Sequence, residues 1–191
     1  MEILKQRILK DGKGIGTSIL KVDTFLNHQI DIDLMEQLGQ EFYQHFKDKH
    51  VTKVLTIEAS GIAIAAFVAK AFNVPLVFAK KVVSKNLEGE ILTASVQSYT
   101  KGLIYLINVS KKFVTEQDNI LIIDDFLANG SALLGLADIV KQGGANLVGA
   151  GIAIEKSFQP GRKRAEEMGI EVYSLACVAS INDSDIKFKE Y

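Results

Sequence analysis

The fold class of this chain follows from the stretch Ile120–Ala132, which reads Ile-Leu-Ile-Ile-Asp-Asp-Phe-Leu-Ala-Asn-Gly-Ser-Ala. Its first four residues are apolar and mostly β-branched, which is typical of a strand buried on both faces. Two carboxylates, Asp124 and Asp125, follow, and then a short loop of small residues. Apolar residues at helical spacing come next and end at Gly143-Gly144, which predicts a helix directly after the loop. In a parallel α/β sheet, ligands bind beyond the carboxyl ends of the strands, so we expect a site here.

The rest of the chain repeats this alternation of strands and helices. We expect further core strands at residues 51–58, 75–79, 148–155 and 170–178, and short strands at 19–22 and 186–188. We expect helices at about 1–10, 31–50, 62–72 and 161–168, and a hairpin of residues 91–96 and 103–107. This order predicts an α/β fold with a doubly wound, mostly parallel sheet, in a single domain of residues 1–191.

The acid pair and the loop together indicate a sugar phosphate as ligand. Free backbone N–H groups at Asn129, Gly130 and Ser131, just before a helix, suit a phosphate group. Asp124 and Asp125 would repel that phosphate, but as hydrogen-bond acceptors they suit the hydroxyl groups of a sugar. Judged on these residues alone, solvated aspartates beside a capped helix are the alternative.

A second strand, tight loop and helix meet at Ala59-Ser60-Gly61-Ile62. The small residues let a ligand approach the backbone, so Ser60 and Gly61 form a second candidate anion site. An ordinary strand-to-helix turn is the alternative. Lys80 and Lys81 follow the strand at 75–79, and either they contact an anion or they are a solvated strand end.

Composition excludes several classes of function. The net charge of −1 argues against nucleic-acid binding, and the sequence contains no apolar run of about 18 residues that would span a membrane. The single cysteine, Cys177, cannot form an internal disulfide, which fits a reduced, cytoplasmic setting. Gly12, Gly14 and Gly16 form a loop without a preceding strand, so the dinucleotide fingerprint fails. His28 has no second ligand at metal-binding spacing, and we expect no metal site in the protein.

Residues 120–132 resemble the phosphoribosyl diphosphate (PRPP) motif of type I phosphoribosyltransferases, in which an apolar strand, two acidic residues and a small-residue phosphate loop occur in this order. The resemblance implies that family's fold, with a small hood formed by residues 1–35 and the C-terminal segments. It also implies a flexible loop at about 83–102 that closes over PRPP, Mg²⁺ bound mainly through PRPP, and a homodimer.

The resemblance assigns roles to individual residues. It implies that Asp124 and Asp125 orient the ribose and stabilise positive charge near C1′, and that Lys81 stabilises the leaving pyrophosphate. The PRPP-binding residues that it implies are Ser60 and Gly61 in the pyrophosphate loop, and Ala128, Asn129, Gly130, Ser131 and Ala132 around the 5′-phosphate.

Three further segments resemble the branch of purine-salvage phosphoribosyltransferases that acts on xanthine: residues 20–31, 92–96 and 154–162. The resemblance implies that Leu20, Asn27 and Lys156 contact the base and that the products are xanthosine 5′-monophosphate (XMP) and pyrophosphate. Lysine only donates hydrogen bonds, so Lys156 suits the oxo groups of xanthine and should reject the amine of adenine. Phe158 either stacks on the base or belongs to the core.

The sequence departs from the wider family at two positions. Ala132 stands where many relatives have threonine, and Ala128 stands where hypoxanthine-guanine enzymes commonly have an aspartate, so no general base is evident. Adenine or hypoxanthine-guanine transfer is the alternative reaction. A PRPP-sensing regulator on the same fold would require a basic DNA-binding extension, which the first 50 residues do not offer. A scaffold would leave the acid pair and both anion loops without a role.

Overall fold

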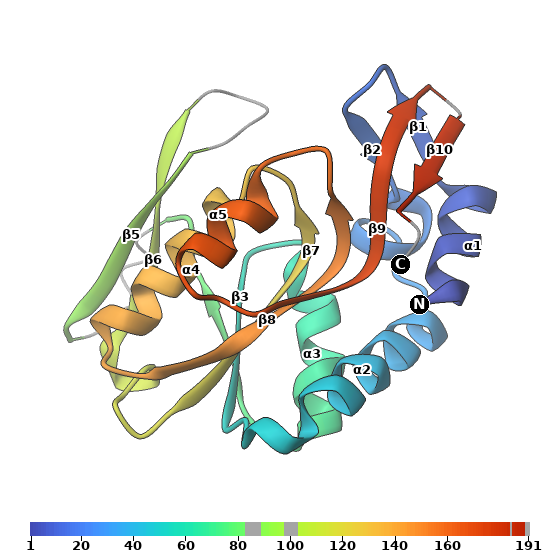
Figure 1. Cartoon of the computed structure of the whole chain (residues 1–191). Helices are drawn as coiled ribbons and strands as arrows, with labels where there is room; N and C mark the ends of the chain where they lie inside the picture. Colours follow the sequence, from blue (N-terminus) through green and yellow to red (C-terminus); the bar gives the residue numbers. More distant parts are fainter. Residues whose placement is uncertain (83–88, 98–102, 184, 190–191) are drawn as a thin grey trace.

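A six-stranded sheet forms the centre of the computed structural model, which describes residues 1–82, 89–97, 103–183 and 185–189 (Figure 1). The strand order across the sheet is β10-β9-β8-β7-β3-β4. These strands are β3 (Lys53–Ile57), β4 (Leu76–Ala79), β7 (Asn119–Leu127), β8 (Asn146–Lys156), β9 (Val172–Asn182) and β10 (Asp185–Phe188). Neighbouring strands are parallel except for β9 and β10, which confirms the predicted mostly parallel α/β sheet.

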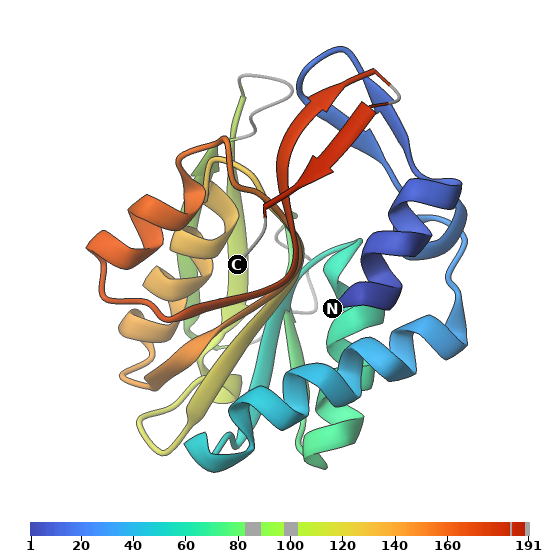
Figure 2. The same ribbon diagram turned by 45° about the vertical axis from the view of Figure 1, so that its right-hand side comes forward.

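Strand β7 is packed from both sides. Ile120 and Ile122 belong to one apolar cluster, and Leu121 and Ile123 belong to the other. Successive side chains of a strand point to opposite faces, so this apolar run supplies both cores at once. One face is covered by α2 (Ile32–Phe46) and α3 (Gly61–Phe72), and the other by α4 (Ser131–Gln142) and α5 (Gly161–Glu167) (Figures 1 and 2).

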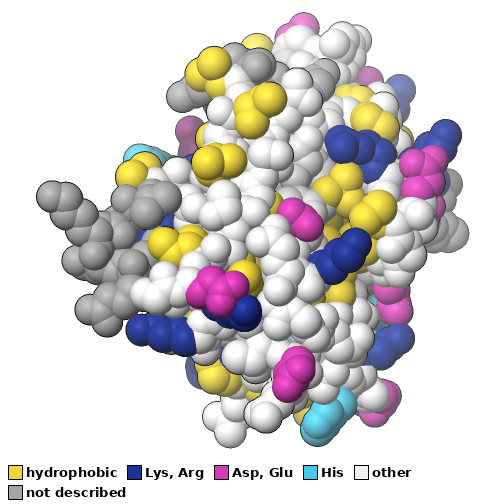
Figure 3. Space-filling view, turned by 90° about the vertical axis from the view of Figure 1, so that its left-hand side faces the viewer, with side chains coloured by type: hydrophobic (Ala, Val, Ile, Leu, Met, Phe, Trp, Pro, Cys, Tyr) yellow, Lys and Arg dark blue, Asp and Glu magenta, His cyan; other side chains and the backbone are white. Residues whose placement is uncertain are grey.

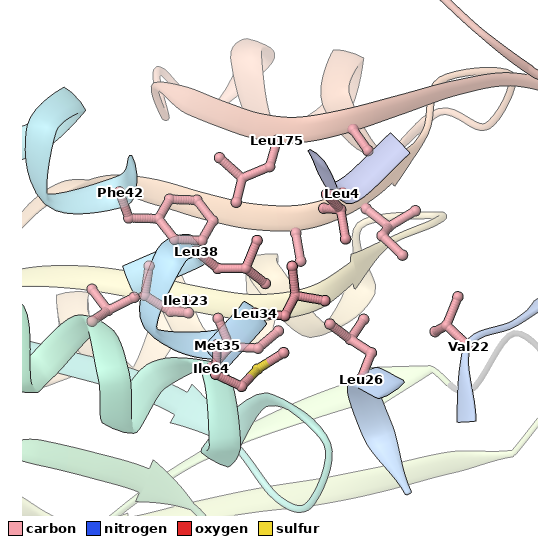
Figure 4. Close-up of a cluster of buried hydrophobic side chains, with 14 of the residues drawn as sticks. Leu4, Val22, Leu26, Leu34, Met35, Leu38, Phe42, Ile64, Ile123 and Leu175 are labelled. Carbon is pink, nitrogen blue, oxygen red and sulfur yellow. The ribbon is translucent and has the colours of Figure 1, made fainter. Parts of the chain in front are cut away.

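Helix α2 supplies much of the first core. Figure 4 shows its labelled side chains beside those of α3 and β7: Leu34, Met35, Leu38 and Phe42 lie near Ile64 and Ile123. The Asp31 carboxylate caps the helix by accepting a hydrogen bond of 3.1 Å from the backbone N–H of Leu34. The sequence spacing predicts a buried face of Leu34, Leu38, Phe42 and Phe46, and all four side chains are buried. The helix ends at Phe46 rather than near residue 50, because a 3₁₀ turn of Lys47–Lys49 follows it.

The two ends of the chain form a small cap beside the sheet. It contains α1 (Glu2–Asp11), the hairpin β1 (Lys13–Ile15) and β2 (Ile19–Lys21), a π-helical turn at Asp23–Asn27, and β10 with the end of β9. The N-terminal ammonium donates to the Leu175 carbonyl at 2.6 Å, and the backbone N–H of Gly16 donates to the Asp183 carboxylate at 2.9 Å. These contacts join residues more than 160 positions apart, so the cap depends on both termini.

Two predictions about the N-terminal segment are wrong. Residues 13–15 form a strand rather than a continuous glycine loop, because they pair with β2, and a Cβ on Gly14 would lie 1.8 Å from the Asp183 carbonyl oxygen. Glycine at this position therefore permits close backbone packing. The sequence also favours an amphipathic helix with Ile3, Leu4, Ile8 and Leu9 on one side, but only Leu4 and Ile8 of α1 are buried, whereas Ile3 and Leu9 are exposed.

A separate antiparallel hairpin, β5 (Ile91–Gln97) and β6 (Ile104–Ser110), packs beside α4 at about the predicted place. Gly135 of α4 permits this contact, since a Cβ there would lie 2.7 Å from Val96. The predicted flexible loop at 83–102 includes β5, and its residues 83–88 and 98–102 lie outside the described residues. Across the described segments, no helix combines the length and apolar character needed to cross a membrane.

Candidate functional site

A cavity of about 530 Å³ opens beyond the carboxyl ends of β3 and β7, where the fold class places ligands. Its wall comes from both strand ends, the loops that follow them, the start of α4, and the hairpin. The residues that line it are Asn27, Ile57, Glu58, Ser60, Lys81, Val96, Gln97, Tyr105, Asp124, Asp125, Phe126, Leu127, Ala128, Asn129, Gly130, Ser131, Ala132 and Leu133. The structure thus brings together most of the residues that the sequence nominated.

The acid pair is almost fully buried at the end of β7. Asp124 is 5% exposed and Asp125 is 7% exposed. The Asp124 carboxylate accepts a hydrogen bond of 3.0 Å from the backbone N–H of Asp125, and the Asn27 side-chain amide donates to the Asp125 carboxylate at 3.2 Å. Burial first, and the neighbouring Asp125 second, raise the pKa of Asp124 well above its ordinary value. A ligand that brings hydroxyl donors or positive charge relieves this cost.

Lys81 lines the same cavity as the acid pair. Its charge partly offsets the raised pKa of Asp124. Its ammonium lies 5.3 Å from the centre of the Tyr105 ring, and its backbone N–H donates to the Glu58 carboxylate at 2.6 Å. Burial, followed by the charge of Asp124, raises the pKa of the Tyr105 hydroxyl, so this group keeps its proton and can donate.

The loop between β7 and α4 has the geometry of an anion site. Gly130 has a φ of +86°, a conformation that favours glycine, and α4 begins at the next residue. The backbone N–H of Ser131, which was predicted to be free for a phosphate, instead donates a hydrogen bond of 3.0 Å to the Asn129 side-chain oxygen, and this contact holds the bend in place. The positive end of a 12-residue helix therefore faces the cavity directly beside the acid pair.

The second predicted loop also reaches this cavity. Ser60 lines it, and Gly61 begins α3. A Cβ on Gly61 would lie 2.3 Å from Thr56 Oγ1 and 3.0 Å from Asp124 Oδ1. Only glycine lets α3 pack this closely against the acid pair. Gly61 therefore supports Asp124 from behind, while Ser60 faces the cavity.

The four predicted base contacts lie in different surroundings. Asn27 lines the cavity through its contact with the acid pair. The Lys156 ammonium donates to the Ser18 carbonyl at 2.7 Å and lies 5.4 Å from the centre of the Phe126 ring, which itself lines the cavity. Burial lowers the pKa of Lys156.

Leu20 and Phe158 do not line the described cavity. Leu20 is buried in the core shared by α1 and α2, and Phe158 is 40% exposed in the turn after β8. Their contacts with a base remain predictions, as does the one assigned to Lys156.

Sequence reasoning missed three residues beside these groups: Glu58, Tyr105 and Phe126 all line the cavity. Phe126 directly follows the acid pair and Glu58 ends a core strand, so their positions gave a usable signal. Tyr105 was less accessible to prediction, because the hairpin that carries it could not be placed against β7 from local patterns.

A buried ion pair beside Lys156 was missed as well. The Glu155 carboxylate is 1% exposed and accepts hydrogen bonds from the Arg162 guanidinium and from the Ser174 hydroxyl at 2.6 Å. The Cys177 thiol donates to the same carboxylate at 3.7 Å. Burial alone would raise the pKa of Glu155, but the hydrogen bonds from Arg162 and Ser174 bring it below the ordinary value. This pair fixes the turn between β8 and α5.

Residues 21–177 match the family model described as "Phosphoribosyl transferase domain". The chain belongs to the phosphoribosyltransferase family. The family that the sequence predicted is thereby confirmed. Among curated proteins, this phosphoribosyltransferase is 56% identical to the xanthine phosphoribosyltransferase of Ruminiclostridium cellulolyticum over 100% of both chains. It is 51% identical to the protein of the same name from Clostridium novyi, over 99% of this chain and 100% of that one.

Solved structures of adenine phosphoribosyltransferases share the fold. The enzyme from Trypanosoma brucei superimposes with a TM-score of 0.77 at 18% identity, covering 91% of this chain and 79% of that one. The enzyme from Rhodothermus marinus gives a TM-score of 0.74 at 20% identity, covering 93% and 100%. At these identities the similarity concerns the arrangement of the phosphoribosyltransferase fold.

Proposed function

We propose that this phosphoribosyltransferase transfers the 5-phosphoribosyl group from PRPP to xanthine, giving XMP and pyrophosphate. The observation that carries the proposal is one cavity in which the buried acid pair lies beside the glycine bend at the start of α4. Full-length identity of 56% to a curated xanthine phosphoribosyltransferase supports the choice of base.

In this proposal the sugar phosphate spans the two halves of the cavity. The 5′-phosphate occupies the bend formed by residues 128–132, where backbone N–H groups, the Ser131 hydroxyl and the α4 dipole stabilise it. The ribose hydroxyls donate to Asp124 and Asp125. The negative phosphate is thereby kept away from the carboxylates, because the bend binds the phosphate and the carboxylates bind the ribose.

The reaction breaks the bond between C1′ and the pyrophosphate oxygen and forms a bond between C1′ and a purine nitrogen. Positive charge develops at the sugar, and the two carboxylates stabilise it. The leaving pyrophosphate lies toward Ser60 and Lys81, whose ammonium offsets its growing negative charge. Ala128 offers no general base, so the proton of N9 passes to water, or xanthine reacts as its anion.

Mg²⁺ bound mainly through PRPP would neutralise part of the phosphate charge. The cavity beside Ser60, Lys81 and the acid pair is where an ion held mainly by the ribose hydroxyls and the pyrophosphate would lie. Magnesium commonly needs only one or two carboxylates, because substrate phosphates and water supply its other ligands. In this proposal the ribose hydroxyls and the pyrophosphate are its main ligands, and the acid pair binds the ribose.

In this proposal, selectivity for the base comes from contacts with Asn27, Lys156, Leu20 and Phe158. The Asn27 amide that donates to Asp125 also has an oxygen that can read the base edge, which ties recognition of the base to the ribose site. The Lys156 ammonium uses one of its three donors on the Ser18 carbonyl and retains two for oxo groups. We propose that Leu20 and Phe158 contact the base as well, although neither side chain lines the described cavity.

We also propose a homodimer in the cytoplasm, in which the cap of residues 1–35 and C-terminal segments covers the base and residues 83–102 close over PRPP. The lone Cys177 is a buried thiol, which suits a reducing compartment. Ile104 and Leu106 of β6 are exposed, and Figure 3 shows the face that carries the hairpin, with hydrophobic side chains in several groups.

A competition assay tests the proposed base. The purified protein is incubated with PRPP, Mg²⁺ and xanthine, guanine, hypoxanthine and adenine together, and the nucleotide products are quantified. We expect XMP to dominate and AMP to be absent, because the donors of Lys156 leave the amine of adenine without an acceptor. A preference for adenine contradicts the proposal.

A further inference from the structure

The phosphate loop is supported from outside the cavity by α5. The Arg164 guanidinium donates a hydrogen bond of 2.6 Å to the backbone carbonyl of Asn129. The side-chain oxygen of the same Asn129 accepts from the Ser131 backbone N–H at 3.0 Å. Both oxygens of Asn129 are therefore engaged by the protein, which holds this residue of the bend in a defined position.

Gly161 packs against the other side of this bend. Its backbone N–H donates to the Ala128 carbonyl at 3.0 Å. A Cβ on Gly161 would lie 2.4 Å from that carbonyl oxygen and 3.0 Å from the backbone nitrogen of Gly130. Residues three apart share one face of a helix, so Gly161 and Arg164 approach the loop together.

The surroundings of Arg164 include an acid, Asp138, which lines a second cavity with it. Arg162 pairs with Glu155 on another side of α5, whereas no carboxylate within the described ranges forms an ion pair with Arg164. The guanidinium lies beside the loop, half-buried, and lines this second cavity of about 330 Å³ together with Ser131.

From these contacts we infer that Arg164 is a positioning residue for the 5′-phosphate. It acts through the Asn129 carbonyl to keep the loop in its anion-binding shape, and it does not contact the reacting atoms. This inference rests on the proposed function only for the identity of the phosphate as that of PRPP. A preformed loop lowers the cost of binding PRPP and leaves the chemistry at C1′ unchanged.

Steady-state kinetics of three variants test the role. Arg164→Met removes the donor, Arg164→Lys keeps one donor and the charge, and Lys163→Met is the matched control, since Lys163 is 80% exposed on the same helix. We expect Arg164→Met to raise the KM for PRPP about tenfold, which corresponds to about 1.4 kcal/mol. The KM for xanthine and kcat should change less than about twofold, because the loop does not contact the base. Arg164→Lys should recover part of the loss, and the control should match the wild type.

A fourth variant makes the test independent of charge. Gly161→Ala places a methyl group against the Ala128 carbonyl, so it should also raise the KM for PRPP selectively. An unchanged KM for PRPP in Arg164→Met overturns the inference. So does an equal loss for both substrates, because a general structural defect would produce it.

Calorimetric titration with ribose 5-phosphate separates this inference from the proposed function. Weaker binding to Arg164→Met than to the wild type supports the role even where xanthine proves to be the wrong base. Equal binding by both proteins overturns it even where xanthine is the right one.

Discussion

Replacing Asp125 by asparagine should separate catalysis from stability. The substitution preserves shape, and the Asn27 amide retains an oxygen to which it can donate. The negative charge beside C1′ is lost, and losses of this kind of electrostatic stabilisation cost about 10²-fold in kcat or more. The folded protein should gain stability at the same time, because Asp124 no longer shares a buried site with a second carboxylate.

The gain in stability has a definite scale. Two like charges about 4 Å apart repel by about 1 kcal/mol in water and about 4 kcal/mol near a protein surface. We take the lower end, about 1 kcal/mol, because the pair faces an open cavity. For a chain of this length that corresponds to an increase of about 2–4 °C in Tm.

The stability of the folded protein should also depend on pH in a defined direction. The folded pKa of Asp124 is raised, so the folded protein binds more protons than the unfolded chain between the ordinary value of 3.8 and the raised one. Its contribution to stability therefore falls as pH rises through that window. Asp125→Asn should flatten this fall, and the difference in Tm between variant and wild type should be largest at neutral pH.

The assay combines initial rates of XMP formation with melting curves at several pH values. Asp48→Asn is the matched control, since Asp48 is exposed in the turn after α2 and lies outside the cavity. An Asp125→Asn protein with full activity would refute the catalytic role. A variant that is less stable than the wild type at neutral pH would refute the account of the buried pair.

Three further predictions concern neighbouring residues. Glu155→Ala leaves Arg162 without its buried partner, and because the Arg162 side chain is 27% exposed the loss should be about 2–3 kcal/mol, measured by urea unfolding. The contribution of Glu155 should be present above pH 4.5 and disappear as pH falls through its lowered folded pKa. Gly61→Ala should cost about 1–3 kcal/mol and also lower kcat, because its methyl group would meet Thr56 and displace the acid pair, as melting and rate measurements would show. Lys156→Met should raise the KM for xanthine about tenfold, with the KM for PRPP as the internal control, and equal changes in both would contradict its role at the base.

Local patterns sufficed where one segment carries its own signal. The apolar run before Asp124 requires burial on both faces, and Gly130 followed by a helix requires a bend, so strand, acid pair and loop were predictable together. The cap was harder to predict. Gly14 lies in a strand that pairs with β2, and the distant Asp183 packs so closely against it that no side chain would fit, a contact that no local pattern records.

Side-chain contacts between segments that are distant in the sequence could not be predicted either. The sequence around Glu155 indicates an ordinary strand end, and only the fold places Arg162 and Ser174 beside it. Arg164 has the sequence context of a solvated helix residue, yet it reaches the loop 35 positions earlier. Burial and charge pairing across elements decide such roles, whereas periodicity describes one element at a time.

A crystal structure with XMP bound tests the central claim most directly. The account predicts the 5′-phosphate within hydrogen-bond distance of the backbone N–H groups in the bend at Gly130, and the ribose hydroxyls about 2.6–3.0 Å from the carboxylates of Asp124 and Asp125. A nucleotide whose ribose lies away from these two carboxylates, or whose phosphate lies outside the bend at Gly130, would contradict it.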